Sequence, residues 1–320
     1  MDLPHLRYFL AVVDRGSIKA AAASAGVTEP SVSQGIRALE HELRTLLFRR
    51  IGRGMVPTSA GHALVGPARR LLRDIASAGG SVTDTDGHLR GQLTIHSLPS
   101  VSSGTLPTLV AAFRRLHPRV SVTIGSLGEA TGLAELLRDG GCDIAVTHLP
   151  FDRSLNLDES DRALDDLELG FQEYWVAYPP GAEAPESDPM AWDEVDTPLV
   201  VVPKARRHGP SHAISILRML SPAQQTRRPA ATVENREARL AFTLAGVGAT
   251  WIERSMAETA RTKGAQVRAL TPRLSVPYGL VFDRHTLSAA AAAFVGLARD
   301  HVARSDDSTT ARKAAAAGES

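Results

Sequence analysis

Apolar side chains near the N-terminus recur at helical spacing in three successive segments. The first stripe begins at Leu3, and the second segment, 18–25, is rich in alanine, the best helix former, behind the good N-cap Ser17. Gly26 then allows the left-handed conformation that ends a helix at little cost. The third stripe consists of Val32, Ile36, Leu39 and Leu43, at spacings of four, three and four residues.

The face of the third predicted helix opposite its apolar stripe is polar. Serine and glutamine can hydrogen-bond base edges, and arginine can pair with a base or a phosphate. We therefore predict a helix-turn-helix from Ser17 to Leu43 whose second helix enters the DNA major groove. The alternative is an ordinary amphipathic helical hairpin with a solvated polar face. The residues expected at the DNA in this helix are Thr28, which would also cap it, Pro30, Ser31, Ser33, Gln34 and Arg37.

Two short strands are predicted next, around the turn Gly52-Arg53-Gly54. This hairpin is a wing that places Arg50 and Arg53 within reach of phosphates or the minor groove. Over 1–58 there are eight Lys or Arg residues against five acids, an excess of three, whereas the whole chain has a net charge of +1. The positive charge is therefore concentrated in the predicted winged helix-turn-helix.

Several short motifs follow one another in the first sixty or so residues: Phe9-Leu10-Ala11-Val12-Val13, Gly16-Ser17, Pro30-Ser31-Val32-Ser33, Ile36-Arg37-Ala38-Leu39-Glu40, Leu47-Phe48-Arg49-Arg50 and Thr58-Ser59-Ala60-Gly61. With these motifs the segment resembles the N-terminal domain of the LysR-type transcriptional regulators. Two departures from the family pattern stand out. Glu29 replaces the usual Gln and would repel phosphate unless it accepts a cytosine amino group. Gly35 replaces the usual Gln or Asn and weakens the helix by roughly 0.5–1 kcal/mol relative to Ala, so base preference is expected to differ.

A long helix is predicted from Thr58 to about Thr85. Its apolar positions follow a heptad seam, which indicates pairing with a copy of itself; a single surface helix is the alternative. Pro67 could kink the helix. The resemblance implies the linker helix of a dimer, and commonly a tetramer, and two winged helices would then read half-sites about 34–36 Å apart. The seam consists of Leu64, Ala68, Leu71, Ile75, Ala78 and Val82.

Beyond the polar segment 84–88 the pattern changes to alternating strands and helices. Strands at 92–97, 120–125 and 143–147, with helices at 104–117 and 133–138 between them, predict a parallel sheet with helices on both faces. The acidic stretch 151–170 is interpreted as an irregular crossover. A second α/β unit follows, with strands at 171–178, 198–202, 232–233 and 249–252 and helices at 212–220, 237–245 and 254–261; strands at 267–270 and 278–282 and a helix at 287–302 then return to the first unit.

The predicted architecture is α/β with an all-α N-terminal winged helix-turn-helix. Two Rossmann-like lobes joined by crossovers are typical of periplasmic-type binding proteins, which close on a ligand by hinge motion. The resemblance to the LysR type continues more weakly over 91–302, and the sequence departs from the family at Trp251-Ile252-Glu253. The predicted divisions are 1–58 for DNA binding, 59–88 for the linker helix and hinge, 89–304 for the effector-binding domain (lobe 1 about 89–163 and 266–304, lobe 2 about 164–265), and 305–320 for a disordered tail.

An effector site is predicted where the parallel strands end, between the lobes. Hydroxyl groups and free N–H groups after the first strand, at Ser100 and Ser102, could hold an anion such as a carboxylate. Thr147, Val202 and Gly248 are expected to complete the cleft. The alternative for each serine is plain helix capping.

Composition excludes several other classes of protein. The chain is 43% hydrophobic and 22% charged, as in soluble globular proteins, and its single cysteine, Cys142, cannot form an intramolecular disulfide. No apolar run approaches about 18 residues, and the N-terminus lacks the pattern of a secretion signal, so a cytoplasmic protein is expected. His208 and His212 lack a third ligand nearby, and no phosphate loop, nucleophile elbow or dinucleotide fingerprint is present, so neither enzyme, metal nor cofactor is expected.

The sequence thus predicts a bacterial, sequence-specific transcription regulator controlled by a small-molecule effector. Its expected partners are double-stranded DNA, a second copy of the chain and, by resemblance, RNA polymerase. Two alternatives stay open: an effector-independent regulator whose α/β part serves only assembly, and a small-molecule-binding or enzymatic α/β protein that does not bind DNA.

Overall fold

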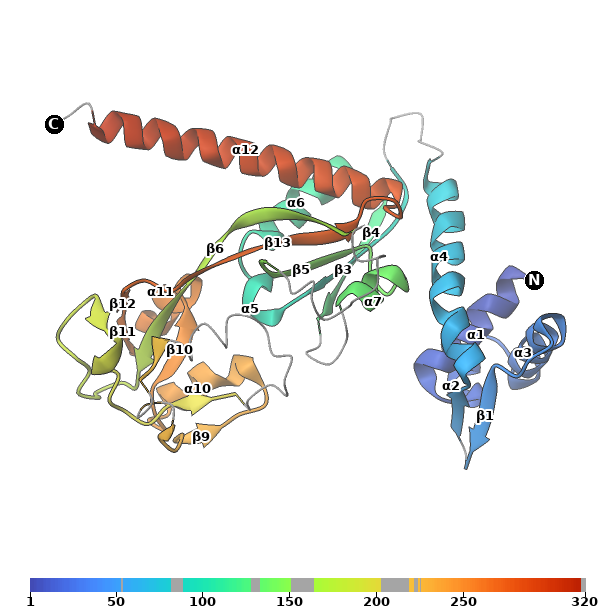
Figure 1. Cartoon of the computed structure of the whole chain (residues 1–320), viewed down its shortest axis with the longest axis horizontal. Helices are drawn as coiled ribbons and strands as arrows, with labels where there is room; N and C mark the ends of the chain where they lie inside the picture. Colours follow the sequence, from blue (N-terminus) through green and yellow to red (C-terminus); the bar gives the residue numbers. More distant parts are fainter. Residues whose placement is uncertain are drawn as a thin grey trace.

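The computed structural model of the chain describes residues 1–52, 54–81, 89–127, 133–150, 164–202, 219–221, 224 and 226–317. The predicted helix at 212–220 therefore lies almost entirely outside the described residues. The described parts form an N-terminal helical domain, a long helix and a two-lobed α/β domain (Figure 1).

The N-terminal domain has the three predicted helices and the predicted wing. α1 (Leu3–Arg15), α2 (Ile18–Ala25) and α3 (Glu29–Leu43) are followed by the antiparallel strands β1 (Phe48–Ile51) and β2 (Gly54–Pro57). Both expected caps are present, since Ser17 Oγ accepts from Ala20 N and Gly26 takes a left-handed φ of 66° after α2. The rings of Phe9 and Phe48 lie 5.3 Å apart, which joins the wing to the helical core.

The linker helix is described as α4 (Ser59–Ser81), and the end of the predicted helix, 82–85, lies outside the described residues. Thr58 caps it, accepting from Gly61 N at 3.0 Å and donating to Leu46 O at 2.7 Å. An ion pair of 2.6 Å between Arg69 Nη2 and Asp14 Oδ1 joins α4 to α1. In Figure 1, α4 stands between the N-terminal domain and the α/β domain.

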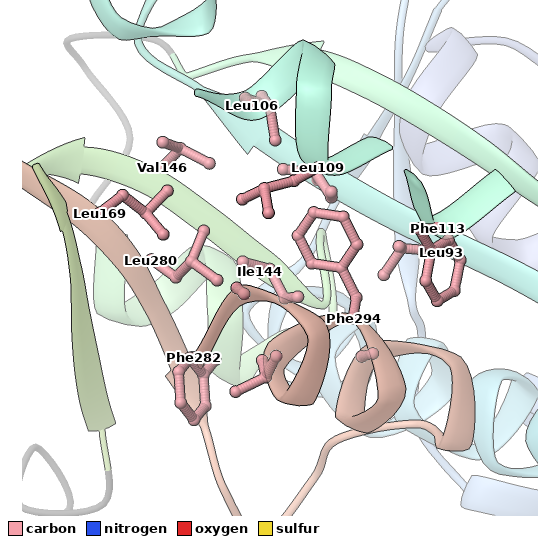
Figure 2. Close-up of a cluster of buried hydrophobic side chains, with 14 of the residues drawn as sticks. Leu93, Leu106, Leu109, Phe113, Ile144, Val146, Leu169, Leu280, Phe282 and Phe294 are labelled. Carbon is pink, nitrogen blue, oxygen red and sulfur yellow. The ribbon is translucent and has the colours of Figure 1, made fainter. Parts of the chain in front are cut away.

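Lobe 1 is built on the three predicted parallel strands. β3 (Gly91–Ser97) pairs in parallel with both β4 (Val120–Ser126) and β5 (Ile144–His148). Ile144 and Val146 point into the core beneath α6 (Leu106–Leu116) and α12 (Ala289–Ala317), which Figure 2 shows closing over the sheet. Ala145 packs on the opposite face against α7 (Leu133–Arg138), so helices cover both faces as predicted.

The sheet as a whole is mixed, because two long strands join it in the opposite direction. β13 (Ser275–Asp283) is antiparallel to β5, and β6 (Leu164–Tyr178) is antiparallel to β13. The prediction of an irregular crossover is therefore wrong for 164–170. The acids at 165, 166 and 168 are exposed or half-buried between leucines, and the stretch is a strand because it pairs with β13; residues 151–163 lie outside the described residues.

Lobe 2 is assembled on the far ends of these two strands (Figure 1). β10 (Thr250–Glu253) and β11 (Gln266–Arg268) pair antiparallel with β6. The indoles of Trp192 and Trp251, 5.4 Å apart, lie in its core. Two parallel strand pairs complete lobe 2, β8 (Val200–Val201) with β9 (Ala231–Thr232) and β7 (Met190–Ala191) with β12 (Leu270–Thr271). Its helices are α10 (Arg239–Leu244), α11 (Ala257–Thr262) and the 3₁₀ turns Trp192–Glu194, Arg236–Ala238 and Arg254–Met256. The short helix α5 (Pro99–Ser102) belongs to lobe 1.

The disordered tail predicted from Ser305 is also wrong for most of its length. α12 continues without a break to Ala317. Alanine is the commonest residue between Gly296 and Gly318, and neither glycine nor proline occurs there, so a helix already packed at its start meets no residue that would end it.

Candidate functional site

The polar face of α3 is accessible along its first two turns. Thr28 caps the helix, with Oγ1 accepting from Ser31 N at 3.3 Å and lying 2.9 Å from Ser31 Oγ. Pro30, Gln34 and Arg37 are exposed, and Ser33 is half-buried. The residues predicted at the DNA in this helix therefore lie together on its outer face and its N-terminal end.

The wing is fixed to α3 by one carboxylate. Glu40 Oε1 accepts hydrogen bonds from Leu47 N at 2.8 Å and Phe48 N at 3.3 Å, at the start of β1. Arg49 and Arg50 follow at once in β1, and both are exposed. Arg53, predicted at the tip, lies outside the described residues.

Gly35 lies on the buried side of α3, which differs from the sequence expectation of a position that affects base preference. A Cβ there would lie 2.8 Å from Tyr8 Cδ2 and 3.0 Å from His5 Cδ2, both on α1. The missing side chain lets α1 and α3 approach closely. Glu29, in contrast, is exposed at the start of α3, where a charge would meet an approaching phosphate.

Two adjoining clefts open between the lobes. A larger cleft, of about 480 Å³, is lined by Ser100, Gln172, Glu253 and Tyr278 among others. A smaller cleft, of about 270 Å³, has Ser100, Ser102, Arg239 and Glu253 in its wall. Because Ser100 and Glu253 line both, they mark the boundary at which lobe 1 meets lobe 2.

Ser100 is held from behind by a buried polar network on the strands that connect the lobes. Gln172 Nε2 donates to Ser100 O at 2.7 Å, and the Tyr174 hydroxyl hydrogen-bonds the Ser100 side chain. His148 Nε2 lies 3.1 Å from Gln172 Oε1 and 3.4 Å from the Tyr174 hydroxyl. Burial lowers the pKa of His148 to about 4, so its ring is neutral at neutral pH, and burial also raises the pKa of Tyr174.

Two opposite charges lie at the lobe 2 side of the smaller cleft. Arg239 Nη2, at the start of α10, is 3.9 Å from Glu253 Oε1, at the end of β10, and the exposed fractions of the two side chains are 10% and 7%. Burial lowers the pKa of Arg239, while the nearby Glu253 carboxylate opposes that shift. A buried arginine and a buried glutamate thus face the cleft without an ordinary hydrogen bond between them.

The other predicted effector residues lie outside both clefts. Thr147 is buried in β5 opposite Gly279 of β13. Val202 follows β8 and is half-buried, and Gly248 packs against Pro198 and Ala230, where a Cβ would lie 2.6 Å from Pro198 O. The structure therefore joins Ser100 and Ser102 but does not bring these three residues to them.

Three cleft residues were not singled out from the sequence. Arg239 falls in the predicted helix 237–245, where it is balanced by Glu237 and looks like an ordinary exposed charge, and Gln172 is one of two adjacent polar residues in a strand. Only Glu253 had a signal, since it belongs to the Trp251-Ile252-Glu253 stretch that departs from the family pattern. Burial of charge, which marks Arg239, is visible only in the folded chain.

Comparison with known proteins agrees with this architecture over nearly the whole chain. Residues 3–62 match the family described as "Bacterial regulatory helix-turn-helix protein, lysR family", and residues 86–303 match the "LysR substrate binding domain". The chain belongs to the LysR family. Its two-lobed part is thus the substrate-binding, or effector, domain of that family, and its N-terminal part is the DNA-binding domain.

Several LysR-type relatives match over almost their full length. TfdS of Cupriavidus pinatubonensis is 28% identical over 302 residues, covering 93% of this chain and 98% of the relative. TcbR of Pseudomonas sp. strain P51 is 28% identical over 313 residues, covering 95% and 99%. Both are named as HTH-type transcriptional regulators.

Solved structures share the fold. Full-length CbnR in complex with its target DNA superposes with a TM-score of 0.67 at 23% identity, covering 94% of this chain and 100% of CbnR. A full-length variant of OxyR from Pseudomonas aeruginosa also has a TM-score of 0.67, at 19% identity, covering 94% and 97%. The protein is therefore a LysR-type DNA-binding transcriptional regulator with an effector-binding domain, and it is not an enzyme.

Two further searches concern only the part of the chain that the structure describes. None of its helices is both long and apolar enough to cross a membrane. No group of three or more His, Cys, Asp or Glu side chains there is arranged to hold a metal ion.

Proposed function

We propose that this LysR-type chain reads a specific DNA sequence through α3 and that a small molecule bound beside Ser100 sets its activity. A carboxylate is the first ligand class to test. The observation that carries the DNA part is the accessible polar face of α3 next to the exposed arginines of β1. The observation that carries the effector part is a cleft with walls from both lobes, which a ligand could hold closed.

The roles of the DNA-binding residues follow from their chemistry. Ser31, Ser33, Gln34 and Arg37 contact base edges, and Thr28 and Pro30 place the start of α3 at the backbone. Arg50 and Arg53 contact phosphates. In the effector domain, Ser100 and Ser102 bind the ligand, and Thr147, Val202 and Gly248 stay predictions for the surrounding walls.

The working state of this regulator is a homodimer or homotetramer in the cytoplasm that also contacts RNA polymerase. On α4, Leu71 and Ile75 are each 39% exposed, an unusual position for large apolar side chains and one that pairing with a second α4 would cover. The resemblance supports the tetramer, the polymerase contact and the compartment.

Fluorescence anisotropy tests the DNA proposal, with DNA from upstream of the chain's own gene against random DNA over a salt series. We expect Arg50→Ala to weaken binding to both DNAs about equally and to reduce the salt slope by about one. Gln34→Ala should instead relax preference at one base-pair position. Arg115→Ala, which removes an exposed arginine of lobe 1, is the matched control. Absence of binding at any salt would contradict the proposal.

The second candidate is a regulator that needs no effector, with the α/β domain used for assembly alone. Thermal unfolding separates the two, since a ligand that binds only the folded chain raises the Tm with its concentration. The cleft favours the regulator that binds an effector, because buried charges that face a space between the lobes are expected in a binding site and are not needed for assembly.

A further inference from the structure

Four charged residues line the smaller cleft, Arg236, Glu237, Arg239 and Glu253, and only Arg239 and Glu253 are nearly buried. These two are also poorly paired with each other. Arg239 and Glu253 come from different elements of lobe 2, and their nearest charged atoms are 3.9 Å apart. That distance is too long for a hydrogen bond, which joins such atoms at about 2.7–2.9 Å when both are charged.

Their remaining contacts leave hydrogen-bonding capacity unused. Among the described residues, Arg239 donates through Nε to Arg236 O at 3.1 Å, and no hydrogen bond of its two terminal nitrogens occurs. The Glu253 carboxylate likewise accepts no hydrogen bond from the described residues. A buried ion pair stabilises a fold only when its geometry is close and its other donors and acceptors are satisfied. This pair therefore contributes little to stability as it stands, which points to a role in binding.

Lobe 1 brings neutral donors to the same cleft. Ser100 and Ser102 of lobe 1 line it together with Arg239 and Glu253 of lobe 2, and the Ser102 hydroxyl already donates to Pro99 O at 2.8 Å. Ser100 is fixed in place by Gln172 and Tyr174, so its position is set before any ligand arrives. The cleft of about 270 Å³ lies just below the usual size range of sites for drug-sized ligands, so it suits a small molecule.

We propose that the effector is a small zwitterion of the α-amino acid class, bound through its carboxylate to Arg239 and through its ammonium group to Glu253, with Ser100 beside them. This inference rests on the proposed function, since it names the ligand class of the effector cleft. Binding replaces one loose ion pair with two close ones, and each buried charge gains hydrogen bonds.

Ligands with a single charge fit this cleft less well. A plain carboxylate would pair with Arg239 but would repel the Glu253 carboxylate, which lines both clefts. A plain amine would pair with Glu253 and leave Arg239 facing a cation. Only a ligand that carries both charges satisfies both residues, which makes the pair a filter against either half of the molecule.

Thermal unfolding and calorimetry on the full-length protein test this inference. The probes are the twenty standard α-amino acids, each compared with its deaminated acid and its decarboxylated amine at the same concentration. We expect at least one amino acid to raise the Tm, and both of its counterparts to bind at least about tenfold more weakly. If a plain carboxylate or a plain amine raises the Tm as much as the amino acid does, the proposal of a zwitterionic effector is overturned.

Variants separate a binding role from a structural one. Arg239→Gln and Glu253→Gln should each lower the Tm, because each leaves a buried charge without its partner. The double variant should recover the Tm of the unchanged chain yet bind the amino acid at least about tenfold more weakly. The matched control is Arg228→Gln with Glu258→Gln, an exposed pair of the same charges in lobe 2, which should keep the ligand response.

The outcomes also distinguish this inference from the function on which it rests. If a plain carboxylate stabilises the chain and Ser100→Ala removes that effect, the cleft is an effector site and only the zwitterion is overturned. If no probe changes the Tm while specific DNA binding is intact, the amino acid class and the effector function both fail. A double variant that binds the amino acid as well as the unchanged chain would also overturn the inference.

Discussion

Gly35 lies where α3 crosses α1, and its lack of a side chain sets how closely the two helices approach. The ring of Tyr8 and the imidazole of His5 occupy the space that a Cβ would need. Glycine is costly inside a helix, so its presence here indicates that close packing outweighs helix propensity. The orientation of the recognition helix therefore depends on a residue that does not face the DNA.

We expect Gly35→Ala to destabilise the N-terminal domain by about 1 kcal/mol. Alanine gains roughly 0.5–1 kcal/mol in helix propensity, but overpacking of a close contact typically costs about 1–3 kcal/mol. In a background that carries both His5→Ala and Tyr8→Ala the methyl group has room, so the same substitution should become slightly stabilising. Hydrogen exchange of the α1 and α3 amides reports both effects locally. An equal change in the two backgrounds would show that propensity alone acts at Gly35.

At the scale of single residues, the sequence identifies side chains whose role follows from local periodicity. The apolar stripe of α3 is enough to place Gln34 and Arg37 on the outer face, where the structure has them. It is not enough for Arg239 and Glu253. These two residues become a candidate binding pair only because α10 packs beside β10 and buries both side chains. The residues next to them in the sequence do not indicate either contact.

The wing is held to α3 by Glu40, whose carboxylate accepts hydrogen bonds from two backbone N–H groups at the start of β1. We expect Glu40→Ala to lower the free energy of local opening at β1 by about 1–3 kcal/mol, because two buried donors lose a charged acceptor. DNA affinity should fall with it, since Arg49 and Arg50 lie in β1. Hydrogen exchange at Leu47 and Phe48 measures the first effect and anisotropy the second.

Glu42→Ala is the control for this prediction. It removes an exposed ion pair of 2.8 Å with the N-terminal amine from the same helix, and such pairs contribute about 0–1 kcal/mol. Equal losses for the two variants would mean that the wing is held by helix charge and not by the hydrogen bonds of Glu40.

Elements closed by local contacts were predictable, and those joined by distant strands were not. The three N-terminal helices carry their own caps and apolar stripes, and α7 has the predicted bounds. The pairing of β13 with β5 joins segments more than a hundred residues apart, and no local pattern specifies its direction. For the same reason the acidic start of β6 resembles a loop in sequence, because its partner strand is distant.

Across the whole effector domain, β6 and β13 connect the two lobes, and the network behind Ser100 lies on them. Gln172 and Tyr174 belong to β6, and His148 belongs to β5 of lobe 1. A ligand held between Ser100 and lobe 2 therefore acts on the strands that set the lobe arrangement. It can shift that arrangement only by as much as its affinity differs between the open and closed forms.

His148 makes this network sensitive to acid. Burial lowers its pKa from the usual 6.5 to about 4, so between these values the unfolded chain binds more protons than the folded one. The stability that the neutral ring confers is thus fully present above pH 6.5 and is lost as the pH falls toward 4. The loss attributable to His148 should reach up to about 3 kcal/mol.

We expect His148→Asn to flatten the dependence of unfolding free energy on pH between 7 and 4.5, because the amide does not titrate. Denaturant unfolding followed by tryptophan fluorescence suits this measurement, since all three indoles, at Trp175, Trp192 and Trp251, lie in or beside lobe 2. His62→Asn, at an exposed histidine of α4, is the matched control. Parallel profiles for the His148 variant and the unchanged chain would show that the ring is not the acid-sensitive part of this network.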